Sequence, residues 1–113
     1  MEMTEQEFAY RAVVKPESPS RVWSLIAYRV PTDGPFEAVI WSVPRKSWIY
    51  APELAVRFIF DYQYQDKSRP VDRATAEQIA RETLQTELPT ETTLEAMCEE
   101  GERMGWIAGP PRH

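Results

Sequence analysis

Residues 40 to 55 read IWSVPRKSWIYAPELA. Two apolar segments flank the residues PRKS, a pattern typical of two antiparallel strands joined by a turn. Trp41 and Trp48 flank this turn nearly symmetrically, so we expect them to be cross-strand neighbours whose contact fixes the register. Pro52 then suits the first turn of a helix. The stretch therefore predicts a hairpin followed directly by a helix.

The residues before this hairpin also predict strands. Apolar side chains alternate over residues 8 to 14, and residues 22 to 30 carry apolar side chains on both faces. Strict alternation places these on two faces: Val22, Ile26, Tyr28 and Val30 on one, and Trp23, Leu25 and Ala27 on the other. The connections PESPS and PTDGP are rich in turn residues. Residues 7 to 50 therefore predict an antiparallel meander of three or four strands.

The segment after the hairpin allows two interpretations. Residues 52 to 62 repeat apolar side chains at helical spacing, which favours a helix. The sequence VRFIF within them also alternates, so a strand is the alternative. The polar sequence QYQDKSRP that follows is typical of a connecting loop or a short edge strand.

Two further helices are predicted in the second half of the chain. Asp72 is placed to cap a helix that begins with RATAEQIA. The last helix begins after Thr90, or after Thr92 with Glu95 completing a capping box. Gly105 is placed to end this helix in a left-handed conformation.

These elements predict an α+β fold, with an N-terminal antiparallel sheet of three or four strands followed by two or three helices packed on one face. The 113 residues are too few for two ordinary domains, so we expect residues 1–113 to form a single domain. Residues 1–6 and 109–113 are expected to be frayed.

Composition excludes several classes of function. The single cysteine, Cys98, cannot form an internal disulfide, and no N-terminal signal peptide is recognisable, which favours a cytoplasmic protein. No apolar stretch approaches the roughly 20 residues that span a bilayer, so no membrane partner is expected. The only histidine is His113 in the frayed end, and the four glycines form no phosphate-binding loop. We therefore predict no catalytic residues, metal or other cofactor.

The negative charge of the chain lies in its second half. Residues 1 to 60 hold seven basic and seven acidic side chains, whereas residues 61 to 113 hold six basic and eleven acidic ones, which accounts for the net charge of -5. Binding to nucleic acid depends on cationic side chains that displace counterions from phosphates. A basic protein is therefore the expected partner, and nucleic acid is disfavoured.

The last predicted helix contains the sharpest functional clue. It carries four glutamates spaced four, four and three residues apart, which places them along one face: Glu91, Glu95, Glu99 and Glu102. Like charges at this spacing destabilise a helix by a few tenths of a kcal/mol per pair. A solvated helix face is the ordinary explanation. The functional explanation is an acidic ridge that docks on a positively charged surface.

We therefore predict a small acidic, non-enzymatic protein-binding domain, in particular an inhibitor or immunity-type protein that docks its acidic helix on a basic partner. The analogy with immunity proteins is one of size, acidity and lack of catalytic groups. The predicted partner-binding residues are the four glutamates and three aromatic anchors: Glu91, Glu95, Glu99, Glu102, Trp48, Tyr62 and Tyr64.

Other interpretations of the sequence stay open. The first is a domain that binds a small ligand or single-stranded nucleic acid on the aromatic sheet face, through Trp41, Arg45, Lys46 and Trp48. The second is an enzyme or hard-cation site that uses Asp61, Tyr62 and Asp66, although this segment lacks the glycine of a calcium-binding loop. A homodimer formed through the aromatic sheet is also compatible with the sequence.

Overall fold

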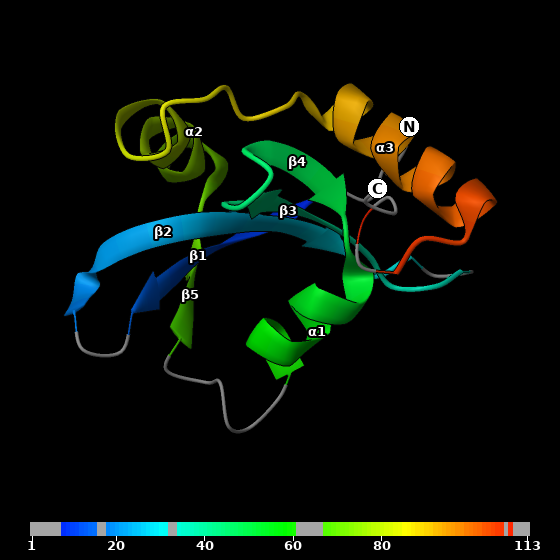
Figure 1. Cartoon of the computed structure of the whole chain (residues 1–113), viewed down its shortest axis with the longest axis horizontal. Coiled ribbons are helices and arrows are strands. Elements are labelled where there is room, and N and C mark those ends of the chain that lie inside the picture. Colours follow the sequence, from blue (N-terminus) through cyan, green and yellow to red (C-terminus); the bar gives the residue numbers. More distant parts are fainter. Residues whose placement is uncertain (1–7, 16–17, 32–33, 61–66, 108, 110–113) are drawn as a thin grey trace, which may run out of the picture.

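The computed structural model describes residues 8–15, 18–31, 34–60, 67–107 and 109 (Figure 1). Five strands form one antiparallel sheet in the order β4-β3-β2-β1-β5. The strands are β1 (Ala9–Lys15), β2 (Ser18–Arg29), β3 (Glu37–Ser42), β4 (Ser47–Tyr50) and β5 (Ser68–Val71). The helices are α1 (Pro52–Phe60), α2 (Arg73–Glu82) and α3 (Glu91–Met104). The predicted α+β fold is confirmed.

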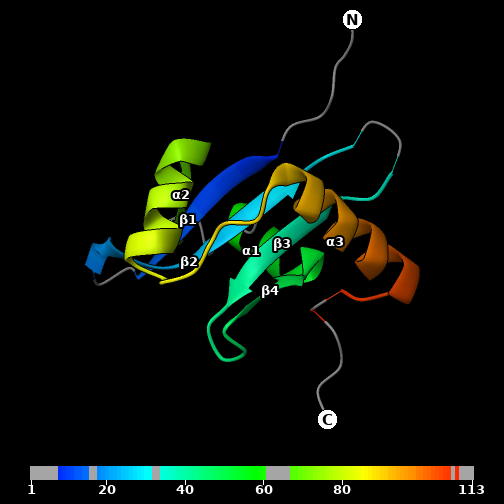
Figure 2. The same ribbon diagram turned by 90° about the horizontal axis from the view of Figure 1, so that it is seen from above.

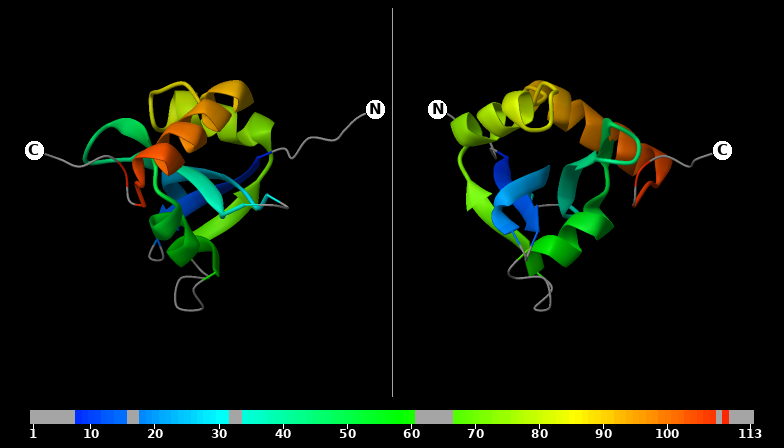
Figure 3. Two further views of the ribbon diagram at one scale, coloured as in Figure 1. Left: turned by 90° about the vertical axis from the view of Figure 1, so that its right-hand side faces the viewer. Right: turned by 60° about the vertical axis from the view of Figure 1, so that its left-hand side comes forward.

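The sheet is covered on both faces (Figures 1 and 3). Helices α2 and α3 share one face, where Leu25 and Ala27 of β2 are fully buried in their core. Helix α1 lies on the opposite face, where its Ala55 packs in a second core with Ile26. Because β2 is apolar on both sides, it requires cover from both layers. Figure 2, seen from above, shows α2 and α3 lying over the sheet.

A β-bulge changes the orientation of the N-terminal part of β2. Val13 of β1 pairs with Ser24, but the next residue, Val14, pairs with Val22, so that Trp23 has no partner in this ladder. Val22 consequently packs in the α2/α3 core together with Leu25. The predicted strict alternation, which placed Val22 on the face of Ile26, is wrong at this position because a bulge reverses the face of the residues beyond it.

The hairpin and the helix after it form as predicted. Trp41 and Trp48 are cross-strand partners, and their rings meet edge to face with centroids 5.3 Å apart. The turn Val43–Lys46 connects them. The segment beginning at Pro52 is a helix, as its apolar spacing indicated, and the polar segment before Asp72 supplies the short edge strand β5.

The ends of α2 and α3 confirm their predicted caps. Asp72 accepts a hydrogen bond from the backbone N–H of Thr75 (2.8 Å), and Thr90 accepts one from that of Thr93 (3.1 Å). Gly105 ends α3 in the left-handed region, with φ of 74°. No described helix has the length and apolar character needed to cross a membrane.

Candidate partner-binding face

The first strand pair and the hairpin provide partners for most of the predicted acidic ridge. Three of its glutamates accept hydrogen bonds from the sheet: Glu91 from the Tyr10 hydroxyl (3.0 Å), Glu95 from Arg29 (3.1 Å) and Glu102 from the Tyr50 hydroxyl (3.4 Å). These carboxylates therefore help to hold α3 on the sheet. Their partners are between 52 and 81 residues away along the chain.

A buried ion pair lies beneath this part of α3. Arg29 and Glu37 face each other across β2 and β3, with the guanidinium Nε 2.5 Å from the Glu37 carboxylate, and their side chains are only 17% and 9% exposed. Burial raises the pKa of Glu102, and a hydrogen bond with the Glu37 carboxyl raises it further. Three carboxyl groups, those of Glu37, Glu95 and Glu102, thus meet around one guanidinium where α3 crosses the sheet.

The buried groups nearby are kept neutral by their surroundings. Cys98 is completely buried, and burial, followed by the negative charge of Glu37, raises the pKa of its thiol to about 12. Burial also raises the pKa of Tyr50, and the nearby charge of Glu102 adds to this shift. Cys98 is therefore a buried core residue, and its raised pKa disfavours the reactive thiolate.

Glu99 differs from the other three members of the ridge. Its side chain is exposed and forms no hydrogen bond or ion pair with any residue of the described segments. The neighbouring Glu100 is in the same situation. Glu82 and Glu87 are also exposed on this side, and we call Glu82, Glu87, Glu99 and Glu100 the outward acidic face.

The layer formed by α2, the following loop and α3 is strongly acidic. Residues 72 to 104 contain three arginines, Arg73, Arg81 and Arg103, against nine acidic residues, and no lysine. The acidic residues are Asp72, Glu77, Glu82, Glu87, Glu91, Glu95, Glu99, Glu100 and Glu102. This layer therefore accounts for the whole negative charge of the protein, and the rest of the chain is close to neutral.

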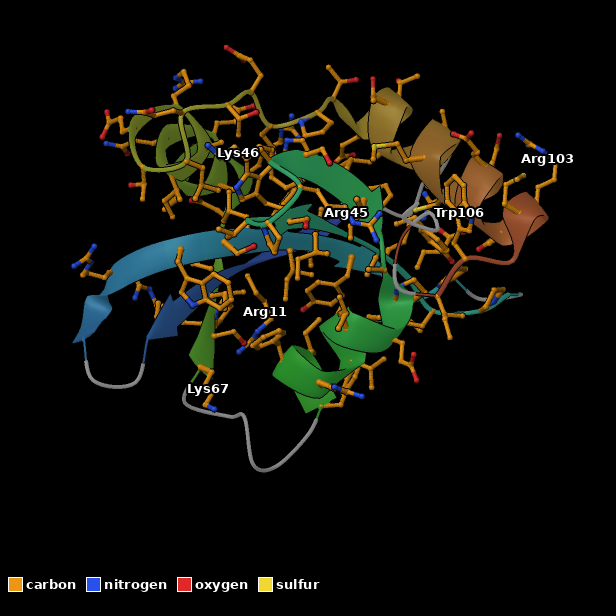
Figure 4. The ribbon with its side chains drawn as sticks, viewed as in Figure 1. Arg11, Arg45, Lys46, Lys67, Arg103 and Trp106 are labelled. Atoms are coloured by element: carbon orange, nitrogen blue, oxygen red, sulfur yellow. The ribbon has the colours of Figure 1, made fainter. Side chains whose placement is uncertain are left out.

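A small pocket of about 210 Å³ opens beside the outward acidic face, between β4 and α3. It is lined by Trp48, Ile49, Tyr50, Met97, Glu100 and Trp106. The Trp48 indole N–H donates to the backbone carbonyl of Glu87 (3.1 Å), which fixes the ring. Figure 4 shows Trp106 close to the C-terminal half of α3. Two indole rings and a carboxylate suit the aliphatic stem and the cationic head of a lysine or arginine side chain.

Trp106 and Glu100 were missed as site residues in the sequence, although a signal for Trp106 existed. Gly105 adopts a Schellman-type cap, in which the Trp106 N–H donates to the Gly101 carbonyl (2.9 Å). In this motif the residue after the glycine commonly returns to the helix surface with an apolar contact. Gly105 therefore predicts the return of Trp106, but not the pocket it completes.

The remaining predicted site residues are divided among different places. Trp41 and Lys46 line a separate groove, which lies on the same face of the hairpin because the Trp41 ring contacts that of Trp48. Arg45 is half-buried in the β3–β4 turn. The predicted anchors Tyr62 and Tyr64, and the carboxylates of the open enzyme hypothesis, Asp61 and Asp66, lie outside the described residues.

Comparison with known proteins gives no family for this chain. No protein-family model matches it, and neither the curated proteins nor the solved structures contain a significant match. Within the segments that the structure describes, no group of three or more His, Cys, Asp or Glu side chains is placed to hold a metal ion.

Proposed function

We propose that this domain is a non-enzymatic inhibitor that binds a basic protein through its outward acidic face, in the manner of an immunity protein. The observation that carries the proposal is the charge of one layer: nine acidic residues against three arginines in residues 72 to 104. Like charges placed so close together do not favour folding. These acidic residues would instead complement a positive surface on a partner protein.

The pocket beside this face supplies the specific contact that charge alone does not. Charged rims mainly accelerate association and select the partner, whereas buried anchors provide most of the binding energy. We propose that a lysine or arginine of the partner enters between Trp48 and Trp106 and pairs with Glu100. Trp48 thus keeps its predicted role as an anchor, although it receives the partner side chain instead of projecting into the partner.

We expect inhibition because of the kind of protein that carries a positive surface complementary to the outward acidic face. Extended positive surfaces are typical of enzymes that act on polyanions. A small acidic domain bound to such a surface excludes the polyanionic substrate from it. The proposed mode of action is therefore steric and electrostatic cover of the partner's substrate site.

The test compares affinity capture by the wild-type domain with capture by two charge-reversal variants. Glu100→Lys changes the proposed binding pocket, and Glu53→Lys is the matched control because Glu53 is exposed on α1, on the opposite face of the sheet. Captured proteins are eluted with increasing salt and identified. Any basic protein obtained is then assayed for its own activity with and without the domain.

The expected result is a stoichiometric basic partner that is released by salt, is retained by Glu53→Lys and is lost with Glu100→Lys. Its activity falls when the wild-type domain is added. Capture of an equal amount by both variants, or of a partner without a positive surface, would contradict the proposal. If the partner's activity is unchanged in the complex, the proposed inhibitory role is rejected, but the proposed binding face is not.

A further inference from the structure

A second site is indicated by a groove of about 580 Å³ that includes Trp41, the cross-strand neighbour of Trp48, on the same face of the hairpin as the Trp48 pocket. It is formed by the start of β2, the β3–β4 turn and the loop after α2. Its lining includes Arg21, Trp23, Trp41, Lys46 and Gln85. The volume is within the range of roughly 300–1,000 Å³ that is usual for small-molecule sites.

The backbone around this groove is unusual. Lys46 (φ 53°) and Gln85 (φ 57°) are the two residues other than glycine with a left-handed backbone in the described part of the chain. Both line this groove, although they come from the β3–β4 turn and from the loop after α2. Glycine is favoured in this conformation, and non-glycine residues that keep it tend to cluster at functional sites. Lys46 and Gln85 thus occupy positions where glycine would fit the backbone better.

Two cations of the groove lack partners within the described segments. The side chains of Arg21 and Lys46 are exposed and form no ion pair or hydrogen bond with another described residue. This contrasts with Arg29 and Arg73, which pair with glutamates. Figure 4 shows Lys46 on the side of the hairpin that faces α2. The two cations therefore bring positive charge to a groove whose α2 loop lies between Glu82 and Glu87.

Two tryptophans add aromatic surface to the same groove. Trp41 is half-buried and held by its edge-to-face contact with Trp48. Trp23 occupies the β-bulge and remains 38% exposed. Bulges commonly re-aim a side chain next to a functional site. Rigid indoles beside cations suit a ligand that has both a ring and a negative charge.

We propose that this groove binds a small planar anion, whose ring contacts the tryptophans while its charged group pairs with Arg21 and Lys46. The groove borders the outward acidic face, because its loop residues 83 to 86 lie between Glu82 and Glu87, but the proposed site uses other side chains and does not depend on the function proposed for that face. A long nucleic acid is less suitable because the net charge of -5 opposes binding to a continuous line of phosphates. A single aromatic phosphate fits both the size and the charge of the groove.

Phenyl phosphate is the probe, and phenol and inorganic phosphate are its two halves. Each is titrated to about 10 mM into the isotopically labelled full chain while amide and indole NMR signals are recorded. We expect saturable shifts at Trp41, Lys46 and Gln85 with phenyl phosphate, and binding at least fivefold weaker for either half. Equal binding of inorganic phosphate, shifts at other places, or no shifts at all would overturn the proposal.

Variants distinguish a specific site from general attraction to cations. Arg21→Gln and Lys46→Gln are each expected to weaken binding of phenyl phosphate at least fivefold. Arg103→Gln is the matched control, since Arg103 is an exposed arginine at the end of α3, far from the groove (Figure 4). An equal loss in this control would show nonspecific attraction and would contradict the assignment.

Lys46→Gly separates a ligand-binding role from a structural one. Glycine relieves the left-handed backbone at this position, so the melting temperature should stay equal or rise. Phenyl phosphate binding should nevertheless fall as it does for Lys46→Gln. A more stable protein with unchanged affinity would show that the lysine serves no ligand.

Discussion

The two sides of α3 carry the same residue type but place it in opposite environments. On the side toward the sheet, Glu95 and Glu102 meet Arg29 and the Tyr50 hydroxyl. On the outward side, Glu99 and Glu100 are exposed and have no partner among the residues described. The glutamates of α3 therefore do not form one uniform surface. The inward carboxylates, although exposed, are hydrogen-bonded to the sheet, whereas the outward ones have no partner among the described residues.

The largest loss of stability is expected from Arg29→Ala, on the side of α3 that faces the sheet. This change leaves the Glu37 carboxylate, which is only 9% exposed, without its cation. Removing one partner of a buried pair costs about 3–5 kcal/mol, because the other charge remains buried. Urea unfolding measures the loss. Glu95→Gln is the control, since its carboxylate is 52% exposed, and it should cost less than about 1 kcal/mol. Equal losses would contradict the distinction between the two pairs.

The next largest loss of stability is expected from a change at Gly101, where α3 packs against Tyr50 of the sheet. Gly101 is buried, and a Cβ there would collide with the ring of Tyr50. Gly101→Ala should therefore lower the free energy of unfolding by about 1–3 kcal/mol despite the better helix propensity of alanine. Ala96→Gly on the exposed side of α3 serves as the converse control and should cost only about 1 kcal/mol. A stabilised Gly101→Ala protein would contradict the packing of α3.

A smaller effect concerns the dependence of the free energy of unfolding on pH. Burial and the Glu37 carboxyl raise the pKa of Glu102 above its ordinary value of 4.5, so the folded protein binds this proton more tightly than the unfolded chain. This contribution to stability is complete below the ordinary pKa and is lost as the pH rises through the raised one. Glu102→Gln should therefore reduce the loss of stability between about pH 4 and pH 7. Chemical denaturation at several pH values checks this, and an unchanged slope would contradict the contact with Glu37.

The smallest effect on stability is expected on the outward side. Glu99→Gln and Glu100→Gln should each change the free energy of unfolding by less than about 0.5 kcal/mol, and a slight gain is expected because like charges are removed. Thermal melts of the two variants beside the wild type give the comparison. A loss above about 1 kcal/mol would show that these carboxylates have stabilising partners in the folded protein.

Local patterns explain which parts of the fold were predictable. The hairpin, the capping residues Asp72 and Thr90, and the glycine end of α3 are all determined by neighbours a few residues apart. The bulge at Trp23 was not predictable, because it depends on how β2 pairs with β1. The placement of α1 on the opposite face also required the three-dimensional arrangement, although the apolar residues on both sides of β2 indicated that both faces are covered.

The candidate site was predictable only in outline. Helical spacing places Glu91, Glu95, Glu99 and Glu102 on one side of α3, but it does not reveal which of them meet the sheet. Their partners lie at least 52 residues away along the chain. Trp48 was identified from its position in the hairpin, whereas its neighbour Trp106 reaches the pocket only through the reversal at Gly105.

The most direct measurement is an NMR titration of the labelled domain with a short arginine-containing peptide. The indole signals of Trp48 and Trp106 and the amide of Glu100 should shift together and saturate. Glu100→Gln should abolish these shifts, and Glu95→Gln, which removes an inward carboxylate of equal charge, should leave them in place. Equal losses in both variants, or shifts that spread over the whole acidic layer, would contradict the division of α3 into a folding side and a binding side.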